Sequence, residues 1–563
     1  MVNCLVNIDD LNSLLEIAKK AVDELKVVDL WKDDFKSTIE LPKANIVNEI
    51  IDILFEMNLV KGYESKLLEF ALAKVLPTDF PAKADELGLD EIADWNNEAA
   101  MIKAIITNVL DIAKNSGIAT YKDIFDLDLS NTDVLKGYAN ATNTNSIANI
   151  IDAVATSKLV EKIASPAFSY VLDKATGSLE MNLEFLKDIT GEELVSDFAR
   201  LSTILRSAVE HKDVFDLLYP DTLTYDEVRV AEICEIVKTA LTELGHFNLL
   251  NKHVDELLST VINYAITQVG LEDLSVSVED FSNVDLSSDM THLVNIIDIA
   301  YNMLVGAIEN ESYNYPITLK QTLDYIDTVM DDATILLEDN NVTSVADILK
   351  EVAEIGIVKA ILPVVVNYGV DKVVEMGYDI SFVKNVQLSS EQLANDIICL
   401  ANAIIDLVNL HAIDIYKNKV VEVNDFDVND LKKLVDHLSQ MNIFSQIKTD
   451  WAAFIVNFAL DTANIGFEKR YTAADFATVN WHADKENVKE ALVNLVNAAQ
   501  KLFSDGISID NIQSFIEKEK YLQDGVINDT VIDYVFDALS NIVSMTVIDV
   551  ILPDAMRFGL QKV

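Results

Sequence analysis

An acidic segment near residue 430 has the residue types and the spacing of a calcium site. Asp425, Asp427 and Asn429 stand at positions 1, 3 and 5 of an EF-hand-like loop, and Asp436 stands at position 12. Position 6 is aspartate rather than the glycine that the sharp turn of such a loop needs, and position 12 is aspartate rather than the bidentate glutamate. The same residues would also cap a helix over 431–438. Calcium binding and helix capping are both open, and the pattern favours capping.

No other group of residues predicts a reaction or a cofactor. A second acidic loop, with Asp126, Asp128 and Asp133, matches the calcium pattern less well. His246 and His253 could share a helix face, but no HExxH motif accompanies them, and the three cysteines form no CxxC pair. The chain also has no Walker loop, GxSxG elbow or GxGxxG motif. We therefore expect no enzyme activity, no catalytic residue and no cofactor.

The elements that would position any site are indicated by a short apolar signature that recurs six times. Each copy ends in alanine, and successive copies lie 92 to 101 residues apart. The alanines are Ala18, Ala113, Ala208, Ala300, Ala401 and Ala499. Self-similarity at such a period is typical of repeat proteins, in which each unit packs on its neighbours. A small residue kept at one position predicts a close approach between helices.

A second apolar signature closes each unit and confirms the period. Its first positions are Met57, Ser157, Phe247, Ile355, Met441 and Met545. Thirteen residues later, five of the six units have an aromatic residue. These aromatic residues are Phe70, Tyr170, Tyr368, Phe454 and Phe558. We predict three helices in each unit, with the alanine on the first and the aromatic residue on the third. Pro166, Pro363 and Pro553 are expected near the first turn of the third helix, where proline is tolerated.

The two signatures together predict an all-α fold. It consists of six tandem helical repeats of roughly 95 residues that form an elongated, solenoid-like array. The predicted boundaries of the six repeats are 1–90, 91–185, 186–282, 283–384, 385–476 and 477–563. Insertions concentrate between the first and second helices of a unit, and in repeat proteins such insertions lie on one face, often the binding face.

The composition limits the partners. The chain has 93 acidic and 43 basic residues, a net charge of −50, and half of its residues are hydrophobic. Such a field repels nucleic acid and anionic membrane surfaces and favours a basic partner. No apolar run reaches 18 residues and the N-terminus has no signal-peptide pattern, so no membrane insertion is expected. We expect a protein partner, of basic character, and leave the oligomeric state open.

The tail signatures Leu59-Val60, Leu159-Val160 and Ile357-Val358 alternate with long Leu/Ile/Ala helices. In this style the chain resembles the helical repeat regions of large surface or secreted proteins of low-GC Gram-positive and wall-less bacteria. The resemblance covers the whole chain. It implies a segment of a longer extracellular or cell-surface protein with a spacer or adhesive role, and it supplies no catalytic residue.

Two other hypotheses stay open at this point. One is a cytoplasmic helical scaffold that binds peptides or basic partners along a groove. The other is an α/α-type enzyme with a dispersed active site, which should gather unique His, Tyr, Arg or Glu residues in one cleft. The sequence contains only five arginines to hold an acidic substrate, so it favours a non-enzymatic scaffold or spacer that mediates protein interaction.

Overall fold

The computed structural model describes most of the chain. The described residues are 8–30, 39–125, 141–176, 181–211, 228–271, 274–309, 317–337, 339–417, 421, 427–463, 467, 469–502 and 529–562. They form two compact units. Unit 1 consists of Met1–Ala265, Ser277–Val294 and Tyr315–Thr322, and unit 2 consists of Ile266–Val276, Asn295–Asn314 and Leu323–Val563.

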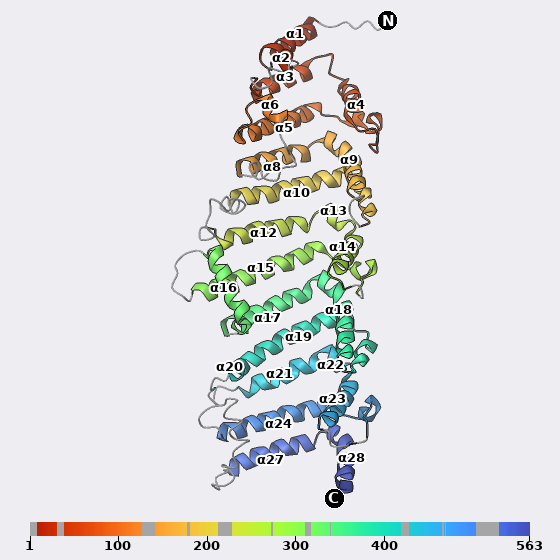
Figure 1. The fold of residues 1–563 in the computed structure, drawn as a ribbon, viewed down its shortest axis with the longest axis vertical. Helices are drawn as coiled ribbons and strands as arrows, with labels where there is room; N and C mark the ends of the chain where they lie inside the picture. The colour runs from red at the N-terminus through yellow and green to blue at the C-terminus, as the bar shows by residue number, and fades with distance from the viewer. Residues whose placement is uncertain are drawn as a thin grey trace. The chain divides into compact units, whose positions relative to one another are not determined.

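Unit 1 contains a row of long helices that pack side by side in chain order (Figure 1). The row consists of α1 (Ile8–Asp23), α3 (Ala44–Glu56), α5 (Trp95–Asn115), α8 (Ala141–Ala155), α10 (Gly191–Glu210) and α12 (Val230–Leu244). A second set of helices lies along one side of this row, next to the ends of the row's helices (Figure 1). It consists of α4 (Glu64–Val75), α9 (Lys158–Thr176), α13 (Asn248–Asn251) and the first part of α14 (Val254–Gln268).

Unit 2 has the same two kinds of helix (Figure 1). Its row consists of α17 (Asp339–Glu354), α19 (Ser390–Asn409), α21 (Val428–Gln440), α24 (Trp481–Leu502) and α27 (Asp529–Val543). Next to the ends of the row's helices, along one side, lie α18 (Gly356–Glu375), α22 (Asn442–Ser445), α23 (Lys448–Ala463) and α28 (Thr546–Lys562). Two long helices, α15 (Leu286–Glu309) and α16 (Leu319–Asp331), contribute to both units.

Short elements complete the fold. The short α-helices are α2 (Val27–Leu30), α6 (Tyr121–Phe125) and α20 (Ala412–Tyr416). The 3₁₀ turns are η2 (Ala84–Glu86), η3 (Leu89–Glu91), η4 (Glu184–Asp188), η6 (Val278–Phe281), η7 (Ala333–Leu337), η8 (Ser381–Asn385) and η10 (Ala473–Phe476). The described residues contain no β-strand, only two isolated antiparallel bridges, Glu40 with Thr120 and Arg229 with Thr318. The prediction of an all-α chain is confirmed.

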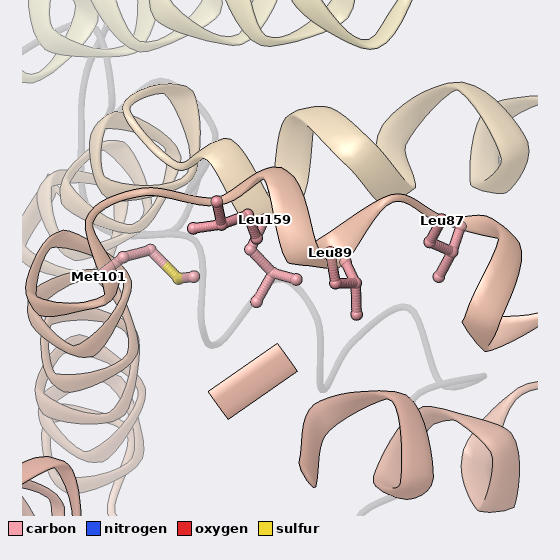
Figure 2. Close-up of a cluster of buried hydrophobic side chains, with 5 residues drawn as sticks. Leu87, Leu89, Met101 and Leu159 are labelled. Atoms are coloured by element: carbon pink, nitrogen blue, oxygen red, sulfur yellow. The ribbon is translucent and has the colours of Figure 1, made fainter. Parts of the chain in front are cut away.

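The buried core collects where the two sets of helices meet. Figure 2 shows one cluster, in which Leu87 and Leu89 from the segment before α5 meet Met101 of α5 and Leu159 of α9. Trp95, at the start of α5, packs against this cluster. Burying one such aliphatic side chain contributes about 1.5–3 kcal/mol. This cluster therefore fastens α5 of the row to α9 of the second set.

The recurring alanines do not all lie at close contacts. Ala401 is fully buried on α19 and Ala113 is 8% exposed on α5, as a close helix approach requires. Ala208 and Ala300 are half-buried, and Ala18 on α1 is exposed. The prediction of a tight interface at every alanine is therefore wrong for α1.

The three prolines lie deeper in their helices than predicted. Pro166 is the ninth residue of α9, and Pro363 and Pro553 are the eighth residues of α18 and α28. Elsewhere a break separates a short first turn from the helix that follows, as between α22 and α23. The prolines stand eight or nine residues after the second signature begins, close to the level at which α23 starts, seven residues after Met441. The prolines therefore lie at the level where the helix is interrupted between α22 and α23. At this level α9, α18 and α28 continue without a break.

Among the residues that the structure describes, one helix meets the length and composition criteria for crossing a membrane. Leu286–Ile308 of α15 has a mean hydropathy of 1.3, and the pair Thr530–Val543 and Thr546–Phe558 meets the criteria together but is bent by 89°. The search of the sequence for uninterrupted apolar runs did not identify α15 as a membrane span. Core helices of soluble proteins meet the same criteria when they are mostly buried, but none of the qualifying window of α15 is buried. Asp289 within α15 would be costly in a bilayer. That no membrane is entered stays a prediction.

Candidate functional site

The most regular polar feature of the described residues is a buried carboxylate near the start of six long helices. Each of these side chains is at most 6% exposed. They are Asp10, Glu98, Asp197, Asp289, Asp396 and Asp484. Carboxylates are seldom buried to this degree unless they are paired or hydrogen-bonded, because burial penalises the charge. Six such residues therefore need partners.

Those partners are backbone N–H groups at the second signature. Asp197 of α10 accepts from the N–H groups of Asn248 and Leu249 at 2.8 and 2.9 Å. Asp396 of α19 accepts in the same way from Asn442 and Ile443, the first two residues of α22. In both pairs the asparagine amide also donates to the carboxylate, at 3.0 Å. One carboxylate thus accepts three hydrogen bonds.

Three further acids make related contacts. Asp484 accepts from the N–H groups of Thr546 and Val547 at 2.6 and 2.8 Å. Glu98 accepts from the Ser157 hydroxyl and from the N–H of Lys158, the latter at 2.9 Å. Asp10 accepts from the N–H of Asn58 at 2.8 Å. The remaining acid, Asp289, is equally buried.

The arrangement is that of a helix cap supplied from another helix. The first N–H groups of a helix lack partners within it, and the positive end of its dipole favours a negative charge. Glu98, Asp197, Asp396 and Asp484 meet both needs across 46 to 62 residues of sequence. Asp10 instead accepts from Asn58, which lies in a turn. These acids are therefore structural, and proton transfer or metal binding would have to displace their hydrogen bonds.

Sequence reasoning missed these acids, although a local pattern marks them. Asp94 caps α5 four residues before Glu98, and Asn480 stands four residues before Asp484. A tryptophan follows the first polar residue in both segments. In α10 and α19 a capping box precedes the acid. Those boxes join Thr190 with Glu193 and Ser389 with Gln392.

The proposed calcium residues are only partly described. Asp425 lies outside the described residues, as do Asp126, Asp128 and Asp133 of the weaker loop. Asp427 is the N-cap of α21, and its carboxylate accepts from the Asn429 N–H at 2.8 Å. This is the capping geometry that the sequence favoured. Among the residues that the structure describes, no three His, Cys, Asp or Glu side chains gather to hold a metal ion.

Histidine and cysteine form no catalytic pair in the described segments. His437 Nδ1 lies 2.6 Å from Oδ2 of Asp406, a carboxylate that is only 3% exposed. Burial raises the pKa of Asp406, and His437 opposes that shift. Burial, with Asp396 nearby, also raises the pKa of the Cys399 thiol, which lowers its reactivity at neutral pH.

Three of the five recurring aromatic residues, in contrast, lie beside cavities. Phe70 of α4 lines a cavity of about 540 Å³, Tyr368 of α18 one of about 590 Å³, and Phe454 of α23 one of about 370 Å³. These volumes fall within the range of small-ligand sites. The aromatic position thus marks the candidate binding surface.

The cavity beside Phe454 is the most aromatic of the three. It lies between the end of α18 and α23, and we call it the aromatic cavity. Its rings are Tyr378, Phe382, Phe454 and Phe458, with Phe454 and Phe458 stacked at 6.1 Å. Tyr378 and Phe458 are 44% and 49% exposed, so the cavity opens to solvent. Its carboxylates are Asp379, Asp450 and Asp461.

Comparison with known proteins identifies no relative of this chain. No protein-family model, curated protein or solved structure matches the chain. Its function therefore has to be inferred from its own residues.

Proposed function

We propose that the chain is a non-enzymatic helical-repeat scaffold that mediates protein interaction. In this proposal six tandem repeats of roughly 95 residues, bounded as the signatures predict, form an elongated solenoid-like array. The array is a segment of a bacterial surface or secreted protein, as the resemblance in sequence style implies. Its third helices present the binding surface.

The buried carboxylates carry the proposal. Asp197 and Asp396 lie on different helices 199 residues apart, yet each accepts from two consecutive N–H groups and an asparagine amide. A single catalytic centre would need one unique constellation, whereas a repeated cap is expected when one supersecondary unit recurs. The same polar contact at successive positions therefore supports repetition of structure.

Exposed apolar side chains support a role in protein binding. On α4, Phe70 and Val75 are 68% and 79% exposed, and on α23 Ile455 and Phe458 are 58% and 49% exposed. Other third helices have similar residues. They are Val171, Val365, Leu552, Met556 and Leu560. Large apolar groups left in water are typical of surfaces that meet another protein. They also occur on the row helices, for example at Leu15 of α1 and Phe536 of α27.

The main alternative is a cytoplasmic scaffold for basic partners, which the net charge of −50 favours. The reading frame around the chain distinguishes the two, because a surface protein should have an export signal and a wall or membrane anchor. An enzyme with a dispersed site is disfavoured, because the buried acids serve as caps.

Small-angle scattering on the intact chain and on a variant lacking 477–563 tests the array. A compact globule of 563 residues would have a radius of gyration of about 24 Å. We expect a clearly larger value, and we expect the truncated variant to stay helical and to unfold cooperatively. A radius near 24 Å together with collapse of the truncated variant would reject the array and favour one closed domain.

A further inference from the structure

The third helices share a contact between their aromatic residue and a lysine. In α4, α9 and α18 the residue four positions after the aromatic residue is lysine, and its ammonium lies over the ring. The pairs are Lys74 over Phe70 at 5.6 Å, Lys174 over Tyr170 at 5.1 Å and Lys372 over Tyr368 at 5.2 Å. Positions four apart share a helix face, and a cation within about 6 Å of a ring centroid is attracted to its π face. Three of these rings are thus covered by the protein's own cation.

The fifth predicted repeat departs from this pattern. Four positions after Phe454 stands Phe458, which stacks on Phe454 instead of bringing a charge. Tyr378 lies 6.1 Å from Phe458, and Phe382 lies 6.2 Å from Phe454, centroid to centroid. The substitution replaces a lysine with a second ring, so the aromatic cavity gains π surface where its counterparts have an ammonium group.

The charged residues that line the aromatic cavity are all acidic. The described lining residues include three aspartates and neither lysine nor arginine. Asp379 accepts from the Ser381 hydroxyl at 2.7 Å, and Asp461 is paired with Arg470, which lies outside the lining. Asp450 stands in the first turn of α23. Aromatic faces beside carboxylates are the environment in which proteins hold ammonium and guanidinium groups.

We propose that the aromatic cavity is a binding site for a lysine or arginine side chain of a partner protein. The partner's cation takes the place that Lys74, Lys174 and Lys372 occupy over the equivalent rings. The cavity of about 370 Å³ is large enough for a side chain and too small for a folded partner to enter. The negative field of the whole chain draws such a basic segment toward it. This inference rests on the proposed scaffold function and names its partner chemistry.

The test uses a fluorescein-labelled peptide in which three arginines alternate with Gly-Ser, and a second peptide with glutamine in place of arginine. Binding to the intact chain is followed by fluorescence anisotropy at physiological salt, where screening over about 8 Å weakens the general field. Phe458→Lys restores the lysine of the other repeats, and Ser540→Lys adds the same charge at an exposed site on α27, outside the third helices. Tyr378→Ala removes one ring without changing the charge.

We expect Phe458→Lys and Tyr378→Ala each to weaken binding of the arginine peptide by about tenfold, and Ser540→Lys by less than about twofold. The glutamine peptide should not bind. Circular dichroism confirms that the variants are folded, which their exposed positions favour. Equal weakening by Phe458→Lys and Ser540→Lys, unchanged binding by Tyr378→Ala, or no binding to the unmodified chain would overturn the proposal. None of these outcomes changes the scattering result. The scaffold proposal can therefore be rejected or supported independently of the aromatic cavity.

Discussion

Asp197 on α10 holds the start of α13 through Asn248, although 51 residues separate the two. The carboxylate accepts the backbone N–H of Asn248 at 2.8 Å and its side-chain amide at 3.0 Å. Because Asp197 is only 5% exposed, water cannot easily replace it. The contact therefore fixes the N-terminal part of α10 against the first residues of α13.

Removing this carboxylate should cost more than removing a surface acid. Asp197→Ala leaves the N–H groups of Asn248 and Leu249 without their acceptor, and we expect a loss of about 1.5–3 kcal/mol in the free energy of unfolding. Glu192→Ala, at an exposed position of the same helix, is the control and should change it by less than about 0.5 kcal/mol. Urea unfolding followed by circular dichroism measures both. Equal midpoints would show that the cap contributes little.

A close backbone contact makes a second prediction. A Cβ built on Gly191 would lie 1.7 Å from the carbonyl oxygen of Glu161, so alanine cannot fit without moving α10 from α9. We expect Gly191→Ala to destabilise the chain by about 1–3 kcal/mol through overpacking. Gly369→Ala is the matched control, because nothing lies within 4 Å of its added Cβ. It should leave stability unchanged or raise it by up to about 1 kcal/mol. A thermal melt in which both variants behave alike would contradict the contact.

Helix positions could be predicted from apolar periodicity, but the level of each residue along its helix could not. Ala401 follows the buried acid Asp396 by five residues, whereas Ala18 follows Asp10 by eight, and the other helices give eleven or fifteen. These offsets differ by three or four residues, which is one helical turn. A five-residue signature therefore finds the right face of a helix and can still be displaced by a whole turn. Ala18 is exposed on α1, the first helix of the row, which packs against α3 and the short α2.

The candidate site was predictable only in part, for a related reason. The aromatic position was visible as a fixed interval after the second signature, and Phe70, Tyr368 and Phe454 do line cavities. Tyr378 and Phe382 come from the segment after α18, and only tertiary packing brings them to Phe454. The calcium pattern could not be separated from a cap by spacing alone, since Asp427 satisfies both patterns.

The alanines supply a third prediction. Ala401 is fully buried on α19, which packs against both α17 and α21, so Ala401→Leu should destabilise by about 1–3 kcal/mol. The same change at the exposed Ala18 should alter the free energy of unfolding by less than about 0.5 kcal/mol. Chemical denaturation of the two variants beside the unmodified chain measures the difference. A similar loss at both sites would mean that exposure does not decide the effect.

The last prediction concerns how stability depends on pH at the buried Asp406, which is paired with the half-buried His437. Burial raises the pKa of Asp406 above its ordinary 3.8, His437 and Lys433 oppose the shift, and Asp430 adds to it. A carboxyl group with a raised pKa holds its proton more tightly in the folded chain than in the unfolded chain. Its contribution to stability is therefore fully present below pH 3.8 and is lost as the pH rises through the raised pKa.

Asp406→Asn cannot titrate, so it isolates this effect. We expect the stability of the unmodified chain, relative to that of Asp406→Asn, to fall as the pH rises from about 3.5 to 7. Glu391→Gln, at an exposed position of the same helix, is compared in parallel to correct for the general charge of the chain. Urea midpoints at five or so pH values between these limits provide the measurement. A difference between the unmodified chain and Asp406→Asn that stays constant or grows with pH would show that burial does not dominate at Asp406, and that its partner His437 instead keeps the carboxylate charged.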